Sequence, residues 1–201
     1  MSEGREVRKT FVARADLLEK LLNLTKSKGV TLYAFVNQVL QVVLEVEGRG
    51  MDLRRVFEEW KEWVRVRSYG LALVPAALWS EVVEEAYGWA GERLVEVSRE
   101  AGEWIAKRIT SSGEPEPLKE LEHIVKLLAS NPPELLFEVS TQGVRVRVAN
   151  PRLSKAHAEV LAAIIEGALS SLGYEGVVKE VGPGLIRIEA WRGGDAKGAQ
   201  G

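Results

Sequence analysis

The stretch that decides the fold is Lys9-Thr10-Phe11-Val12-Ala13-Arg14, together with the two helical patterns that follow it. Apolar and polar side chains alternate over residues 9–14, which predicts a short strand with one face toward a core. The next helix is expected to end at Gly29, which can adopt the left-handed cap, and a second helix to begin behind the N-cap Thr31. A module below about 40 residues rarely builds its own core without a metal, a disulfide or a partner chain. Because the chain has no cysteine, a second copy of this segment is the expected partner.

The apolar faces of the two helices support a homodimer. The first helix carries a single apolar stripe, whereas the second is apolar over too wide a surface to face one short helix. The second helix is therefore predicted to be buried on several sides, as at the centre of a dimer. The apolar positions are Leu17, Leu18, Leu21 and Leu24 in the first helix, and Phe35, Val36, Val39, Leu40, Val42, Val43 and Val46 in the second.

Residues 7–48 resemble the ribbon-helix-helix family of DNA-binding proteins in the alternating strand, the leucine stripe and Lys28-Gly29-Val30-Thr31. In that family two chains pair their strands into an antiparallel ribbon that enters the major groove. The resemblance implies that outward strand residues contact DNA and that N–H groups at the start of the second helix bind a phosphate. The DNA-binding residues implied are Arg8, Thr10, Val12 and Arg14 on the strand, and Thr31, Leu32 and Tyr33 at the helix start.

Charge is unevenly distributed along the chain. Residues 1–30 carry seven Lys or Arg against four Asp or Glu, a net charge of +3, while the whole chain has a net charge of −2. A basic N-terminal segment fits a DNA-binding regulator whose affinity falls as salt rises. Val12, however, is apolar, and Leu32 and Tyr33 replace the small or basic residues that are common in the family. The alternatives are an interaction or scaffold protein that uses the module only as a dimer clamp, and a small-molecule-binding protein.

The rest of the chain predicts an α+β fold with long helices and a C-terminal β-β-α-β-β unit. The predicted domains are a ribbon-helix-helix over 1–48, a linker helix over 49–65, an α+β ligand-binding or dimerisation domain over 66–192, and a disordered tail over 193–201. Two glycines in Glu47-Gly48-Arg49-Gly50 mark the first boundary. The predicted elements are an extended segment at 64–74, helices at 76–109, 118–129 and 153–172, and strands at 135–140, 144–148, 176–181 and 185–191.

Residues 66–192 resemble the small-molecule-binding domain of the 4-vinyl reductase type, which is related in fold to subunits of the transport particle TRAPP. The matching stretches are Leu73-Val74-Pro75, the glycine-spaced segment 87–102 and Val146-Arg147-Val148-Ala149-Asn150-Pro151. The resemblance implies a dimer and a pocket for a small apolar ligand. Many members carry cysteines near the last hairpin that suit a metal, and this chain has none, so no metal is carried over.

No catalytic, metal or cofactor site is predicted. His123 and His157 lack a nucleophile signature or metal-ligand spacing nearby, and each is expected to face solvent. Gly88, Gly91 and Gly102 in the long helix are expected to mark a break or a close approach of another element. No apolar run is long enough for a bilayer and no signal peptide is evident, so we expect a cytoplasmic protein without a membrane partner. The many Glu and Arg residues favour a thermophilic source.

Overall fold

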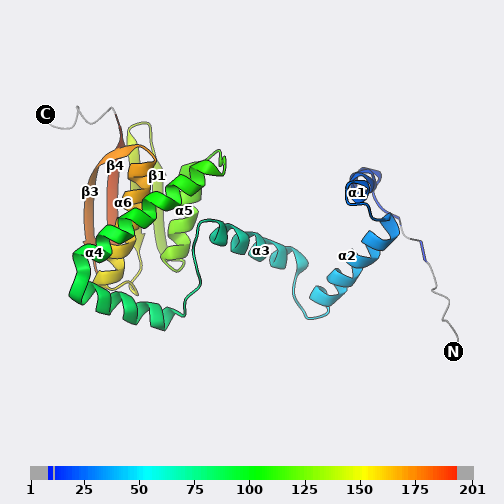
Figure 1. The fold of residues 1–201 in the computed structure, drawn as a ribbon, viewed down its shortest axis with the longest axis horizontal. Helices are drawn as coiled ribbons and strands as arrows, with labels where there is room; N and C mark the ends of the chain where they lie inside the picture. Colours follow the sequence, from blue (N-terminus) through cyan, green and yellow to red (C-terminus); the bar gives the residue numbers. More distant parts are fainter. Residues whose placement is uncertain (1–8, 11, 194–201) are drawn as a thin grey trace. The chain divides into compact units, whose positions relative to one another are not determined.

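The computed structural model describes residues 9–10 and 12–193 and confirms the α+β class. Six helices and one four-stranded antiparallel sheet occupy these residues. The chain divides into two compact units, Met1–Glu62 and Trp63–Gly201. The first unit is helical in its described part, and the second combines helices with the sheet (Figure 1).

The turn between the first two helices is set by the predicted caps. The helices that lie in the first unit or cross its border are α1 (Ala15–Ser27), α2 (Leu32–Glu47) and α3 (Leu53–Ser68). Gly29 has a φ of 65°, and the N–H of Val30 donates to the carbonyl of Thr25 at 3.1 Å, which together form a Schellman motif. The hydroxyl of Thr31 accepts the N–H of Ala34 at 3.2 Å and so caps α2.

The strand predicted over residues 9–14 is not formed in the described part of the chain. Lys9, Thr10 and residues 12–14 have no regular structure, and Phe11 lies outside the described residues. A strand is stable only when another strand pairs with it, and the strands of the sheet all belong to the second unit. The N-terminal unit is thus shown as helical, without the ribbon of a ribbon-helix-helix.

The extended segment predicted over residues 64–74 is wrong in its first half. Helix α3 continues to Ser68, and irregular chain follows up to Pro75. The alternation of Val64, Arg65, Val66 and Arg67 is too short to separate a strand from a helix, and the apolar stripe of α3 extends through it. Gly70, which has a φ of 77°, lies just after the end of this helix.

The second unit follows the predicted order of elements closely. Its helices are α4 (Ala76–Ser111), α5 (Pro117–Leu128) and α6 (Lys155–Ser171), and its strands are β1 (Glu134–Val139), β2 (Gly143–Ala149), β3 (Tyr174–Gly182) and β4 (Leu185–Arg192). The sheet order is β1-β2-β4-β3, with neighbours antiparallel. Helix α4 is broken at Ala90, which has φ −145° and ψ 38° and lies between Gly88 and Gly91, as the glycine spacing predicts.

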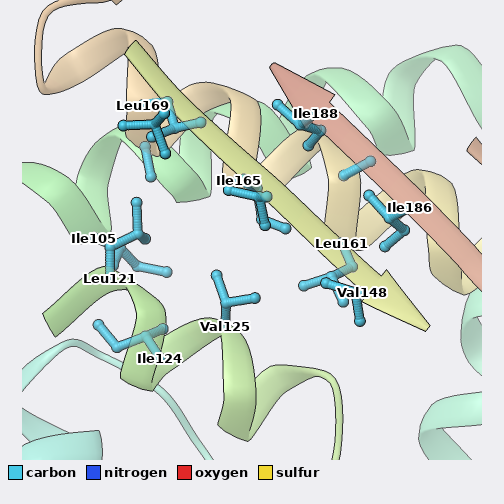
Figure 2. Close-up of a cluster of buried hydrophobic side chains, with 14 of the residues drawn as sticks. Ile105, Leu121, Ile124, Val125, Val148, Leu161, Ile165, Leu169, Ile186 and Ile188 are labelled. Carbon is cyan, nitrogen blue, oxygen red and sulfur yellow. The ribbon is translucent and has the colours of Figure 1, made fainter. Parts of the chain in front are cut away.

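One face of the sheet and the helices α4, α5 and α6 enclose the core. Alternate residues of β2 and β4 point inward, so that Val146 lies opposite Ile188 and Val148 opposite Ile186 in the ladder. Figure 2 shows Val148, Ile186 and Ile188 meeting side chains from the three helices. The helix contributions in that view are Ile105 from α4, Leu121, Ile124 and Val125 from α5, and Leu161, Ile165 and Leu169 from α6.

Helices α4 and α6 cross so closely that their main chains are in contact. A Cβ placed on Gly102 would lie 2.0 Å from the carbonyl oxygen of Ile164, and one placed on Gly167 would lie 2.0 Å from that of Arg99. Each helix therefore presents a glycine to the main chain of the other. Any side chain at either position would force the helices apart.

No single helix in the described part of the chain has the length and apolarity to cross a membrane. The helices α1 and α2 meet those two criteria only as a pair, bent by 107°.

We expect Gly102→Ala to destabilise the second unit by about 1–3 kcal/mol, because overpacking a tight contact displaces backbone. The control is Gly88→Ala in the same helix, where a Cβ meets nothing within 4 Å. This control is expected to be neutral or mildly stabilising, by up to about 1 kcal/mol. Chemical denaturation followed by circular dichroism measures both, and equal stabilities for the two variants would contradict the tight crossing.

Candidate functional site

The residues predicted to bind DNA do not form a common contact surface. Arg8 lies outside the described residues, and Thr10 and Val12 are exposed on irregular chain. The guanidinium of Arg14 forms an ion pair with the carboxylate of Asp16 at 2.8 Å instead of standing free. At the start of α2, Thr31 and Tyr33 are exposed, Leu32 is half-buried, and the Thr31 hydroxyl is used as the helix cap.

The first unit buries almost none of its apolar side chains. None of the residues of α2 is buried, and in α1 only Thr25 is. Leu44 is 73% exposed. Such exposure is unusual for a helix as apolar as α2, whose charged residues are only Glu45 and Glu47. Other large apolar side chains that are exposed in this unit are Leu17, Leu18, Leu22, Leu24, Val30, Tyr33, Val39, Leu40 and Val42.

Three of these exposed side chains share one face of α2. Tyr33, Leu40 and Leu44 are spaced seven and four residues apart, so they lie on one side of the helix. Phe35 and Val46, nearer the opposite side, are half-buried, whereas Val39 and Val42 are exposed outside this face. The face formed by Tyr33, Leu40 and Leu44 is here called the outer α2 face, and its two leucines are exposed.

An ionic cluster around a buried carboxylate in the second unit joins the end of α3 to the start of α5. The carboxylate of Glu120 has a side chain only 8% exposed, and its Oε1 lies 3.3 Å from Nε of Arg65. The hydroxyl of Tyr69 donates a hydrogen bond to the same carboxylate. Burial, this hydrogen bond and the negative charge of Glu120 together raise the pKa of Tyr69 to about 12. Glu120 also lies in the first turn of α5, where the helix dipole favours a carboxylate.

A pocket of about 350 Å³ opens beside this cluster. One wall is formed by the chain at the end of α3 and the other by the last turns of α4. The two walls together combine two aromatic side chains, two cations and three serine hydroxyl groups. The lining residues are Ser68, Tyr69, Trp104, Lys107, Arg108, Ser111 and Ser112.

A second hollow, of about 220 Å³, lies against the outer face of the sheet near the β1–β2 turn. Its charged residues are already engaged with one another. Arg145 binds Glu138 at 3.2 Å and Glu189 at 3.0 Å, and these hydrogen bonds, the one to Glu189 first, raise the pKa of Arg145. The larger pocket is therefore the better candidate for a ligand site.

The two histidines lie away from both pockets. His123 is half-buried on α5. His157 differs from the solvent-facing position expected, because its side chain is 15% exposed, with Nδ1 2.9 Å from the Ser154 hydroxyl and 3.5 Å from a carboxylate oxygen of Glu84. Among the described residues no group of three or more His, Asp or Glu could hold a metal ion.

Comparison with known proteins returned structures alone. No protein-family model matches the chain, and no curated protein matches it. An oxygen-binding H-NOX domain related to soluble guanylate cyclases is 16% identical, with a TM-score of 0.37, over 63% of this chain and 80% of that one. An H-NOX structure concerned with activation is 16% identical, with a TM-score of 0.35, over 63% of this chain and 82% of that one. Likeness at this level carries no argument for what the present chain binds.

The predicted function of a DNA-binding transcriptional regulator is wrong. The structures that the comparison returned are described as H-NOX domains, one of them oxygen-binding. The structure agrees with this correction, since the segment expected to read the major groove forms no strand in its described residues. Arg14, one of its cations, is paired within the chain.

Haem is named for a further similar structure, which is 17% identical with a TM-score of 0.35. A haem needs an axial ligand beside a cavity that accepts the macrocycle. The sequence has no cysteine, and neither His123 nor His157 lines either pocket. Tyr69 lines the larger pocket, but its phenol keeps its proton in the hydrogen bond to Glu120. Aliphatic side chains fill the space between helices and sheet (Figure 2). The described residues do not fit a haem, and we assign none.

The pocket could not be predicted from the sequence because its walls come from segments distant in sequence. Reading residues 64–74 as extended also hid the fact that Arg65 and Tyr69 meet at the end of a helix. One local signal was available. Trp104 and Arg108 are four residues apart in a helix, and this spacing favours the cation–π contact that the structure shows, with Cζ of Arg108 5.4 Å from the ring centre.

We expect one of the four tyrosines to ionise late, near pH 12, in a spectrophotometric titration of the folded protein. The folded pKa of Tyr69 lies above its ordinary value of 10.0, so the protonated phenol stabilises the fold below pH 10, and this contribution is lost as the pH rises toward 12. Tyr69→Phe should remove the late phase, and Glu120→Gln should move it to lower pH. A late phase that persists in Tyr69→Phe would assign it to another residue.

Proposed function

We propose that the chain is an interaction protein that pairs with a second copy of itself through α1 and α2. The observation that carries this proposal is that α2, with charge only at its C-terminal end, buries no residue within its own chain. Burying a large apolar side chain contributes about 1.5–3 kcal/mol. Short helices are marginal in water without such burial. Association supplies the burial that the single unit lacks.

The charge on and beside α2 favours a second copy of the chain as the partner. Lys26 and Lys28 precede α2, and Glu45 and Glu47 lie at its end. Two copies of α2 packed antiparallel bring the acidic end of each near the basic start of the other. The resemblance of residues 7–48 to the ribbon-helix-helix family supports the same pairing, with the segments at 9–14 forming a two-stranded ribbon between copies. In this proposal the module serves as a dimer clamp.

Leu40→Asp on the outer α2 face tests the clamp. A buried charge at an apolar dimer interface costs several kcal/mol, so we expect the variant to be monomeric where the wild type is dimeric. Gln38→Asp introduces the same charge at an exposed position off that face and should remain dimeric. Size-exclusion chromatography with light scattering gives the masses. A monomeric wild type, or a wild type that instead sediments with phospholipid vesicles, would contradict self-association.

A second candidate function is the binding of a small molecule by the second unit. The specific observation in its favour is the pocket of about 350 Å³ lined by aromatic, basic and hydroxyl side chains. Ligand sites usually combine apolar walls with a few convergent polar groups. The resemblance of residues 66–192 to the 4-vinyl reductase type also supports a ligand-binding domain, although this pocket is more polar than the apolar one implied.

Native mass spectrometry of the protein purified from its own host checks this second function. We expect a retained small molecule to add mass to the folded chain and to be lost on mild heating. The double variant Trp104→Ala/Arg108→Gln should lose the added mass. An added mass that survives in the double variant would show that any ligand binds elsewhere, and a wild type without added mass would count against a tightly held ligand.

A further inference from the structure

We propose that the pocket between Ser68-Tyr69 and the last turns of α4 binds a small organic anion with a planar body, whose anionic group faces Arg108. The inference rests on the proposed small-molecule binding and adds the chemical class of the ligand. Four features of the pocket carry it: an unpaired cation, a fixed aromatic wall, the direction of the hydroxyl groups, and size.

Arg108 is the exception among the basic residues of α4. Arg93 pairs with Glu96 at 2.6 Å, Arg99 with Glu166 at 3.3 Å, and Lys107 with Glu103 at 3.4 Å. Within the described part of the chain, Arg108 has a cation–π contact with Trp104 and no carboxylate partner. Its planar guanidinium is suited to bidentate binding of a carboxylate or phosphate. Arg108 is therefore the cation of the pocket that is available to bind an anion.

Trp104 gives the pocket a defined aromatic wall. Its indole Nε1 lies 3.6 Å from the position of a Cβ at Gly70, so the ring rests against the chain that follows α3. The guanidinium of Arg108 lies over the same ring. On the facing wall, Tyr69 is buried and its hydroxyl hydrogen is directed to Glu120. A planar ligand can therefore contact ring surface that is already in place, at little conformational cost.

Each serine hydroxyl group of the pocket donates its hydrogen to a nearby main-chain carbonyl. Ser68 donates to the carbonyl of Arg65 at 2.7 Å, Ser111 to that of Lys107 at 2.6 Å, and Ser112 to that of Ile109 at 2.7 Å. Each oxygen is then left as an acceptor toward the pocket. A matching ligand carries N–H or O–H donors on the part of its body away from the anionic group.

The volume limits the size of the ligand. Pockets for drug-sized ligands span roughly 300–1,000 Å³. At about 350 Å³ this pocket is near the lower bound and fits a single substituted ring rather than a dinucleotide or a haem. An aromatic acid with an amino or hydroxyl substituent has all the features that the walls require.

The probe is 4-aminobenzoate, with 4-aminobenzamide as its neutral match. Both are titrated into the full-length ¹⁵N-labelled protein, and the indole N–H signals of the six tryptophans are followed by NMR, with Trp104→Phe assigning the relevant one. We expect 4-aminobenzoate to shift the Trp104 signal in a saturable way. The amide should bind at least about tenfold more weakly, as expected for loss of a charge-assisted hydrogen bond.

Variants separate the pocket from non-specific charge. Arg108→Gln should weaken 4-aminobenzoate binding at least about tenfold. Arg93→Gln removes the same charge from an exposed site in the same helix and should bind as the wild type does. Equal binding of the amide, or unchanged binding in Arg108→Gln, would overturn the anionic class while leaving small-molecule binding in place. No saturable shift of the Trp104 signal with either probe would overturn both.

Discussion

The second unit depends on the backbone contact between α4 and α6. Gly102 and Gly167 each leave room for a main-chain carbonyl of the opposite helix, so neither helix can move without opening the crossing. With α6 held in this way, its inner face packs on the sheet (Figure 2). The same contact positions the end of α4, and with it Trp104 and Arg108, within two turns of Gly102. The glycine contact in the interior thus fixes the position of the residues of α4 that line the larger pocket.

The two units obtain their stability in different ways. In the second, antiparallel hairpins and three helices bury a common aliphatic core. In the first, the Schellman motif at Gly29 and the cap at Thr31 shape the helices, but these local interactions contribute only about 1 kcal/mol each. Helices of this length need tertiary burial, and no residue of α2 is buried in the described part of the chain. This imbalance is the physical basis of the proposal that the first unit pairs with a second copy.

Elements with strong local signals could be predicted from sequence. The turn at Gly182-Pro183-Gly184, the apolar period of α6 and the break near Gly88 and Gly91 all match the structure to within a few residues. Short alternating segments could not be predicted so well. Four alternating residues at 64–67 fit a helix as well as a strand, and residues 9–14 form no ladder in the described part of the chain. The DNA-binding function inferred from that segment was wrong, while its ribbon-helix-helix resemblance stays a prediction.

Sequence by itself determined the α+β class, the helix caps, the hairpins and the excess of apolar surface on α2, because each of these follows from residues within a few positions of one another. Only the tertiary structure decided that Arg65 and Tyr69 meet the buried carboxylate of Glu120 and that Trp104 and Arg108 face Ser68 across a pocket. These groups come from three helices and a loop. Their meeting depends on how the chain closes over long separations, which local periodicity does not encode.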